Sequence, residues 1–323
     1  MELFPPMPLA DWAPTKRTLH RFLQVVGKIR LESSPRRNHW WHVPFHLTGN
    51  GLTTRPMGQV DGNPVFTVDL DLVGHRLFAR VIDGREASFS LPGHSVATFH
   101  QEVLTTLQGL GVHARIPHPY PYDLPDADRP FADDTEHDDY DPAAVTRYWR
   151  VLSQVGLLLE EFAGRYSGKT SPVHHFWHTL DIATTRFSGT PVRHPEEAGP
   201  LIREAYSREA VSFGFWFGDE AEGAEGTGDA AGPVREPAFY SYTAPEPPGL
   251  AEEPLPPGAE WLATAPGRHL ALLRYDRARL APDPRGAVLD FYEAAYQAGA
   301  RGLGWDTAET ACPGGGTDPY FRH

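Results

Sequence analysis

Apolar positions in the first half of the chain change from helical spacing to strand spacing and back. Leu19, Phe22 and Val26 recur at helical intervals, so they predict a helix. Residues 66–72 carry an apolar side chain at every second position, which is typical of a strand with one buried face. The predicted elements are a helix from about residue 11, strands at 66–72, 77–82 and 87–91, and a closing helix for which Ser95 is the N-cap.

The second half shows the same kinds of pattern over a longer stretch. Asp141 and Pro142 suit the cap and first turn of a helix, and Val145, Tyr148 and Leu152 begin its apolar stripe. The elements predicted after that helix are strands at about 174–184, 206–217, 238–244, 260–264 and 270–275, and a helix beginning at Asp283-Pro284.

Five sequence marks occur in the same order in both halves. They are a Gly-Lys pair, a His-aromatic-aromatic-His segment, a Thr-Thr-Arg triplet, a Gly-to-Leu segment containing His and Arg, and Gly-Leu-Gly. The first set lies at 27–28, 39–42, 53–55, 74–77 and 109–111, and the second at 168–169, 175–178, 184–186, 267–270 and 302–304. We therefore predict an internal duplication and an α+β fold in which two pseudo-repeated helix–antiparallel sheet–helix units pack as one compact body.

Composition sets the expected boundaries of these units. The units are predicted at 11–112 and 141–305, and the Pro- and acid-rich residues 113–140 are predicted to be an extended linker. Residues 219–232 are almost all Asp, Glu, Gly and Ala, which predicts a mobile acidic insert. A flexible tail is expected at 306–323. We expect the units to pack about a pseudo-twofold axis or to join their sheets edge to edge.

Charge and composition exclude several classes of protein. The formal net charge of −13 argues against nucleic-acid binding, which needs a basic face. No apolar run is long enough to cross a membrane, and the N-terminus lacks the pattern of a secretory signal. Cys312 is the single cysteine, so a disulfide framework is excluded. We expect a cytoplasmic protein, and these features define neither a cofactor nor an oligomeric state.

Polar and aromatic side chains in the second half form the best candidate site. A few placed charges within apolar walls are typical of small-molecule sites, and a carboxylate in such walls has a raised pKa suited to proton transfer. The predicted proton-transfer residues are His174, Asp181, Glu204 and Glu209. The predicted ligand contacts are Arg186, Ser188, Ser207, Trp177, Trp216, Tyr240 and Tyr242. Arg186 is suited to a carboxylate or phosphate; the alternative is an Arg–Glu pair that ties two strands together.

Histidines are the second candidate chemistry. They gather at 39–46 and at 174–178, in segments that we expect to be strands. Residues three apart on a strand face opposite sides, so His39 and His42 cannot easily share a metal ion. A metal site would need His174 with ligands from other strands, such as Glu204 or Glu209. A bound metal is therefore less favoured than histidines that stack on aromatic rings and form hydrogen bonds within a sheet.

Six motifs spread over nearly the whole chain are long enough to be specific. They are NHWWHVP at 38–44, GLTT at 51–54, GKTSPVH at 168–174, TRFSG at 185–189, EAYSRE at 204–209 and YTAPEP at 242–247. With these motifs the chain resembles a bacterial family of hypothetical proteins catalogued as a domain of unknown function (number 5996), common in actinobacteria and cyanobacteria. The chain departs from that pattern at His178 and at 217–219. The resemblance implies no activity and assigns no catalytic residue.

These features favour an enzyme that acts on a small anionic or polar metabolite in an aromatic-lined pocket of the second unit. One alternative is a non-catalytic protein that binds a small molecule or a partner in the same hollow. The other alternative is a metal-dependent enzyme with histidine and carboxylate ligands.

Overall fold

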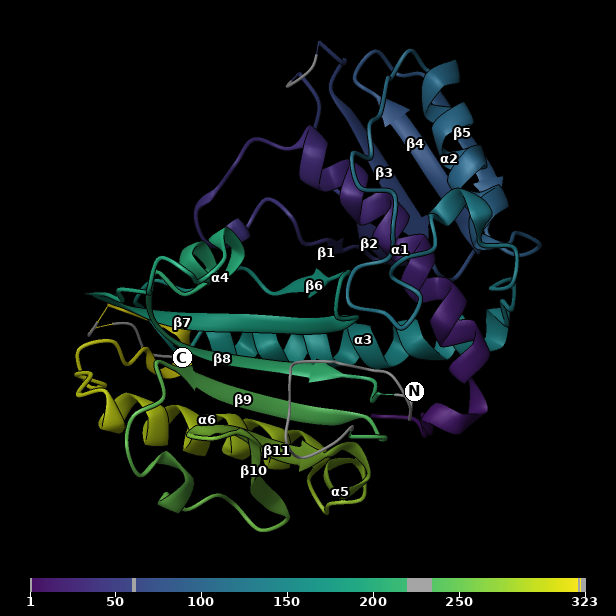
Figure 1. Ribbon diagram of the computed structural model, residues 1–323. Helices are drawn as coiled ribbons and strands as arrows, with labels where there is room; N and C mark the ends of the chain where they lie inside the picture. The colour runs from purple at the N-terminus through teal and green to yellow at the C-terminus, as the bar shows by residue number, and fades with distance from the viewer. Residues whose placement is uncertain (1, 60–61, 220–233, 319, 321–323) are drawn as a thin grey trace.

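The computed structural model describes residues 2–59, 62–219, 234–318 and 320, which form two antiparallel sheets with helices packed against them (Figure 1). The fold is therefore α+β, as predicted. Of the predicted acidic insert at 219–232, only Asp219 lies within the described residues. In the described part of the chain, no helix combines the length and apolar character needed to cross a membrane.

The first sheet is a five-stranded meander in chain order. Its strands are β1 (His46–Leu47), β2 (Gly51–Thr53), β3 (Phe66–Asp71), β4 (Arg76–Val81) and β5 (Glu86–Ser90), with α1 (Ala13–Ser33) before them and α2 (Val96–Gly109) after. Side chains of β3 alternate between buried and half-buried, as the period of two predicts. Ser95 begins α2 as predicted, because its Oγ accepts a hydrogen bond from the Thr98 amide at 3.3 Å.

The second sheet has six strands in the order β10-β11-β9-β8-β7-β6. Its strands are β6 (His174–Phe176), β7 (Asp181–Pro191), β8 (Arg208–Trp216), β9 (Ala238–Ala244), β10 (Ala259–Ala265) and β11 (Arg268–Arg274). Its helices are α3 (Pro142–Ala163), α4 (Pro200–Ala205), α5 (Tyr275–Arg279) and α6 (Pro284–Gly302). One face of this sheet packs on α3 and α6, which run alongside it in Figure 1; the Phe213 ring of β8 lies 4.7 Å from that of Phe162 and 5.8 Å from that of Tyr292.

The two sheets meet at the edges formed by β1 and β6. Phe45 and His175 exchange two main-chain hydrogen bonds, both of 2.9 Å. Beside this bridge, the Trp177 indole donates to the Val43 carbonyl at 3.0 Å and packs against Gly27 of α1. A Cβ atom at Gly27 would overlap the indole, so the helix can approach Trp177 only because residue 27 is glycine. The edge-to-edge arrangement is thus the observed one, whereas descent from a duplication stays a prediction.

The prediction of strands at the histidine-rich segments is wrong for residues 39–42. These residues form the 3₁₀ turn η2 (Asn38–Trp40) and a following turn. His39 and Trp40 have φ values of 53° and 60°, which an extended strand cannot accommodate. The strand predicted at 174–184 is interrupted in the same way, because Leu180 has a φ of 56° and the turn at 177–180 separates β6 from β7.

The segment 113–140 packs closely against the first sheet's helices although it has little regular structure. It contains the short turn η3 (Phe131–Asp133), and the Phe131 side chain is fully buried. Arg21 of α1 forms ion pairs with Asp126 and Asp134 of this segment. The buried Phe131 ring and the ion pairs of Arg21 therefore hold the segment 113–140 against the first part of the chain. The remaining 3₁₀ turns are η1 (Leu9–Asp11), η4 (Leu250–Glu252) and η5 (Pro313–Gly315).

Candidate functional site

The predicted site residues divide between the two faces of the second sheet. Asp181 and Arg186 both belong to β7, but side chains five residues apart on a strand point to opposite faces. Arg186 lies on the face covered by α3 and α6, whereas Asp181 lies on the other face, next to Tyr240 of β9. The structure therefore does not join all predicted residues in one pocket.

On the face of the second sheet that α3 and α6 do not cover, the Asp181 carboxyl accepts hydrogen bonds from two hydroxyl groups. The Thr179 hydroxyl donates to Asp181 Oδ1, and the Tyr240 hydroxyl donates to Asp181 Oδ2. Tyr240 reaches Asp181 by crossing over Gly214 of the intervening strand β8, where a Cβ atom would overlap the phenol ring. We call the surrounding group the Asp181 cluster; its members are Thr179, Asp181, Tyr206, Trp216, Tyr240 and Tyr242.

Burial controls the acid–base properties of this cluster. The Asp181 side chain is 8% exposed, and burial raises the pKa of its carboxyl, although the hydrogen bonds from Thr179 and Tyr240 oppose the rise. Burial and the nearby Asp181 carboxyl raise the pKa of Tyr240 well above its ordinary value. Among the described residues no cation forms an ion pair with Asp181, and its side-chain partners are the hydroxyls of Thr179 and Tyr240.

An aromatic row extends from Asp181 across the sheet. The rings of Tyr240 and Tyr242 are nearly parallel with centroids 6.2 Å apart, and Trp216 lies 5.4 Å from Tyr240. The hydroxyls of Tyr206 and Tyr242 are 3.2 Å apart. Trp216, Tyr206 and Tyr242 are half-buried, so this row reaches the surface while Asp181 lies beneath it.

Arg186 is enclosed in the core on the opposite face. Its side chain is 1% exposed, and its Nη2 donates to the Phe162 carbonyl at 2.7 Å. The guanidinium carbon lies 3.9 Å from the centroid of the Phe162 ring and 4.3 Å from that of Tyr296, so aromatic faces surround the cation. Burial lowers the pKa of Arg186 to about 10. No described carboxylate forms an ion pair with Arg186. The predicted alternative, an Arg–Glu ion pair between two strands, is therefore wrong for Arg186, as is its predicted place in a pocket with Asp181.

Glu209 and Ser188 lie together near the end of α6. The Ser188 hydroxyl donates to Glu209 Oε2 at 2.8 Å, and the Trp305 indole donates to the same oxygen at 2.9 Å. These bonds connect β7, β8 and the chain after α6. Glu209 is therefore held by partners that are separate from those of Asp181.

Glu204 and Ser207 lie at α4, beside the turn η2. Glu204 Oε1 accepts a hydrogen bond from the His39 amide at 3.0 Å. The Lys169 ammonium lies 2.7 Å from His39 Nε2, and burial lowers the pKa of both groups. The Ser207 carbonyl accepts from the Val192 amide at 3.0 Å. The contacts of His39 with Glu204 and Lys169 join the segment before the first sheet to the second part of the chain.

The residues proposed for a metal site lie apart, on two strands and a helix. His174 lies on β6 with its ring centroid 6.0 Å from that of His46, whereas Glu204 is in α4 and Glu209 is held by Ser188. Among the described residues, the group with metal-ligand spacing is Asp126, Asp134 and His137, whose ligand atoms lie within 4.8 Å. Arg21 pairs with both carboxylates, so a guanidinium already balances their charge.

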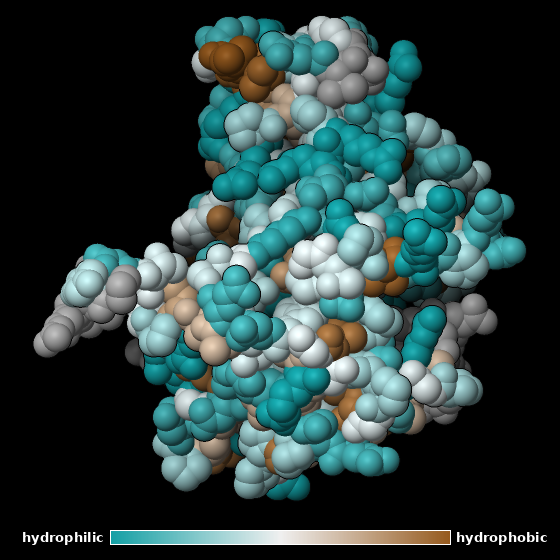
Figure 2. Space-filling model, turned by 90° about the vertical axis from the view of Figure 1, so that its left-hand side faces the viewer, coloured by the Kyte–Doolittle hydropathy of each residue, from teal (hydrophilic) through white to brown (hydrophobic). Residues whose placement is uncertain are grey.

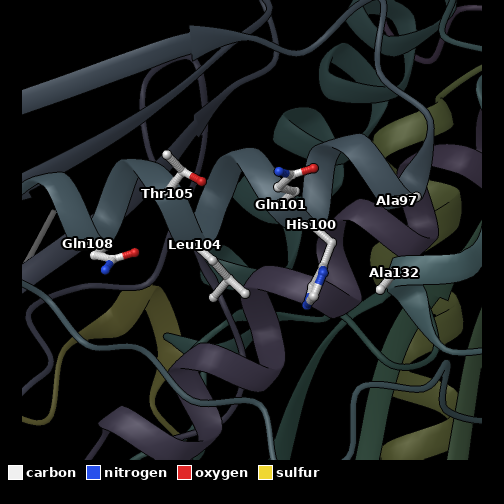
Figure 3. A pocket seen from close by; sticks show the side chains of 7 residues that line it. All are labelled: Ala97, His100, Gln101, Leu104, Thr105, Gln108 and Ala132. Carbon is white, nitrogen blue, oxygen red and sulfur yellow. The ribbon is translucent and has the colours of Figure 1, made fainter.

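Among the described residues, two of the hollows lie away from the predicted site residues. The smaller, of about 290 Å³, lies along α2 between His100 and Gln108, with Ala132 of η3 opposite (Figure 3). The larger, of about 660 Å³, lies between the β1–β2 hairpin and α3, and we call it the hairpin groove. None of the eleven predicted site residues lines the hairpin groove, because its walls come from segments about a hundred positions apart. Within the sequence, three arginines at 30, 36 and 37 against one acid, Glu32, gave only a weak signal of positive charge.

The two antiparallel sheets, joined at their edges and packed against helices, define an α+β protein. The chain belongs to the family of unknown function (DUF5996), which matches residues 4–312. No curated protein and no solved structure matches the chain.

Proposed function

We propose that this protein binds a small polar molecule at the Asp181 cluster and that Asp181 exchanges a proton with it. The observation that carries the proposal is a buried carboxyl whose partners are hydroxyls rather than a cation. A carboxyl that only stabilises a fold commonly forms an ion pair or caps a helix, and Asp181 does neither. A raised pKa increases the protonated fraction of Asp181 at a given pH, and the protonated acid is the form that a general acid needs.

The aromatic row suits a ligand with a flat or ring-shaped body. Tyr242 and Trp216 present half-buried rings, on which a sugar or a heteroaromatic ring could stack. Beside them, Thr185 Oγ1 and Ser212 Oγ lie 2.9 Å apart and add hydroxyl donors and acceptors. The ligand class that fits this surface is therefore a polar metabolite with a ring, and its hydroxyl or ring nitrogen would face Asp181.

A non-catalytic binding protein is the second candidate function. It is favoured by the fact that both oxygens of Asp181 already accept hydrogen bonds. Binding of a large protein partner has less support on the face shown in Figure 2, where hydrophobic groups are small and separated within a mainly hydrophilic surface.

Thermal-shift screening of polar metabolites tests this proposal. A ligand should raise the melting temperature of the wild type and of the control Asp128→Asn, an exposed carboxylate in the segment 113–140. Tyr242→Ala should lose the response. For an enzyme, Asp181→Asn should still bind but turn over at least about 100-fold more slowly. If Tyr242→Ala responds to the same ligands as the wild type, the Asp181 cluster is not the site.

A further inference from the structure

The hairpin groove has the size and lining of a ligand site. Its volume of about 660 Å³ falls within the range of small-molecule pockets, which is about 300–1,000 Å³. Leu47, Trp149 and Val173 give it an apolar part, while Thr53 and Ser153 supply hydroxyl groups. The groove lies between the β1–β2 hairpin of the first sheet and α3, which packs on the second sheet, so both parts of the chain contribute to it.

Arginines without acid partners concentrate at this groove. Arg55 and Arg150 line it, and both are exposed. Behind them, Arg30 is 5% exposed and its Nε donates to the Pro44 carbonyl at 2.7 Å. Within the described part of the chain, none of the ion pairs involves Arg30, Arg37, Arg55 or Arg150. Glu160 is the single carboxylate in the lining.

The positive charge of these arginines helps to lower the pKa of the neighbouring histidines. Burial, together with Arg55, Arg30 and Arg37, lowers the pKa of His46 to about 3. His174 is 1% exposed, and burial together with His46 and the arginines lowers its pKa as well. Both imidazoles are therefore neutral at pH 7 and remain hydrogen-bond donors. Nδ1 of His174 is a buried atom without a hydrogen-bond partner among the described residues.

Local backbone structure fixes the position of Arg55. Its φ of 58° is in the left-handed region, which costs a residue other than glycine about 1 kcal/mol. Thr53 Oγ1 accepts from the Arg55 amide at 3.0 Å, and the Thr54 hydroxyl donates to the Arg55 carbonyl at 3.0 Å. Two threonines thus hold an unfavourable conformation that places the guanidinium at the groove.

Excess positive charge is unusual in this chain, which has a formal net charge of −13. Elsewhere many arginines pair with acids, as Arg80 does with Asp69 and Glu86. Unpaired arginines beside a hollow provide the forked donors that oxyanions accept.

We propose that the hairpin groove is a second site, independent of the Asp181 cluster, which binds a small metabolite carrying a carboxylate or phosphate group. Arg55 and Arg150 donate hydrogen bonds to the oxyanion, and the buried Arg30, which is not part of the lining, adds positive charge near it. The apolar part of the groove, formed by Leu47, Trp149 and Val173, holds the body of the metabolite.

The test measures melting temperatures of the full chain with sodium phosphate or sodium succinate, each titrated to about 50 mM against sodium chloride of equal ionic strength. At least one probe should stabilise the wild type saturably. Arg55→Gln and Arg150→Gln should each weaken the apparent affinity about 10-fold, and Arg55→Lys should recover part of it. The matched control is Arg277→Gln, because Arg277 is an exposed arginine of α5, on the far side of the second sheet.

The two probes separate the two oxyanion chemistries. Stabilisation by phosphate alone assigns the groove to a phosphate ester, and stabilisation by succinate alone assigns it to a carboxylate. Asp181→Asn should respond like the wild type, so failure at the Asp181 cluster leaves this result intact. The proposal is overturned if neither probe exceeds sodium chloride, or if both glutamine variants respond like the wild type. If Arg55→Gln does not fold, Arg150→Gln decides alone, because Arg150 is exposed on α3.

Discussion

Acid should destabilise this protein strongly, because several buried histidines are neutral in the folded state. His46 and His175 each have a pKa lowered to about 3, and burial is the main cause for both. Unfolding restores the ordinary imidazole pKa of about 6.5. Below that pH the unfolded chain binds more protons than the folded chain, so the free energy of unfolding falls as the pH falls.

The size of this effect follows from the two pKa values. Each histidine lowers the free energy of unfolding by about 1.4 kcal/mol per pH unit between pH 6.5 and its folded pKa. His46 and His175 together therefore remove about 5 kcal/mol by pH 4.5. His178, whose pKa burial lowers to about 4, acts in the same direction. Small proteins are stable by about 5–15 kcal/mol, so the chain should lose much or all of its stability near pH 4.5.

Urea unfolding between pH 7.5 and 4.5, in chloride without phosphate, measures this dependence. His175→Gln keeps a polar group beside the Tyr148 hydroxyl, which lies 2.6 Å from His175 Nε2. The variant should reduce the slope by about 1.4 kcal/mol per pH unit. His118→Gln, at an exposed histidine, is the control and should keep the wild-type slope. A stability that stays constant from pH 7 to 5, or an unchanged slope in His175→Gln, would refute the reasoning.

Three further predictions concern packing, capping and charge. Gly27→Ala should lower the free energy of unfolding by about 1–3 kcal/mol, because the added methyl group overlaps the Trp177 ring. Gly109→Ala, which has open space around the added methyl group, should not lower it. Urea titration compares the two variants. Ser95→Ala should cost about 1 kcal/mol of unfolding free energy through the lost helix cap, and equal stability would contradict the observed bond. The pKa of Asp181 is raised in the folded state, so the folded chain binds more protons than the unfolded chain above about pH 4. The free energy of unfolding of the wild type should therefore fall, relative to that of Asp181→Asn, as the pH rises above about 4. Urea titrations in which the two proteins show the same pH dependence would contradict this.

The starts of helices were predictable from the sequence where a side chain caps the backbone amides that follow it. Asp141 accepts from the Ala143 amide at 2.9 Å and begins α3, and Asp283 accepts from the Gly286 amide at 2.9 Å and begins α6. In each case the decisive interaction spans no more than a few residues, and the sequence contains both partners.

The candidate site was predictable only in part, because it depends on which strand faces are covered. Asp181, Tyr240 and Tyr242 lie on one face, as their register across β7, β8 and β9 requires. Arg186 was grouped with them, although its spacing from Asp181 already places it on the other face. The hairpin groove could not be predicted, since α3 meets the β1–β2 hairpin through contacts such as Gly156 with Leu47, far apart in sequence.

The bridge between Phe45 and His175 has a consequence for dividing the protein. A chain cut within 113–140 would leave β1 and β6 as open edges on separate fragments, and open edges promote pairing between molecules. Each fragment produced alone should therefore aggregate, whereas two fragments produced together should reassemble through this edge. We therefore expect neither fragment to fold alone as a monomer, and the contact between β1 and β6 is a natural place for a split reporter.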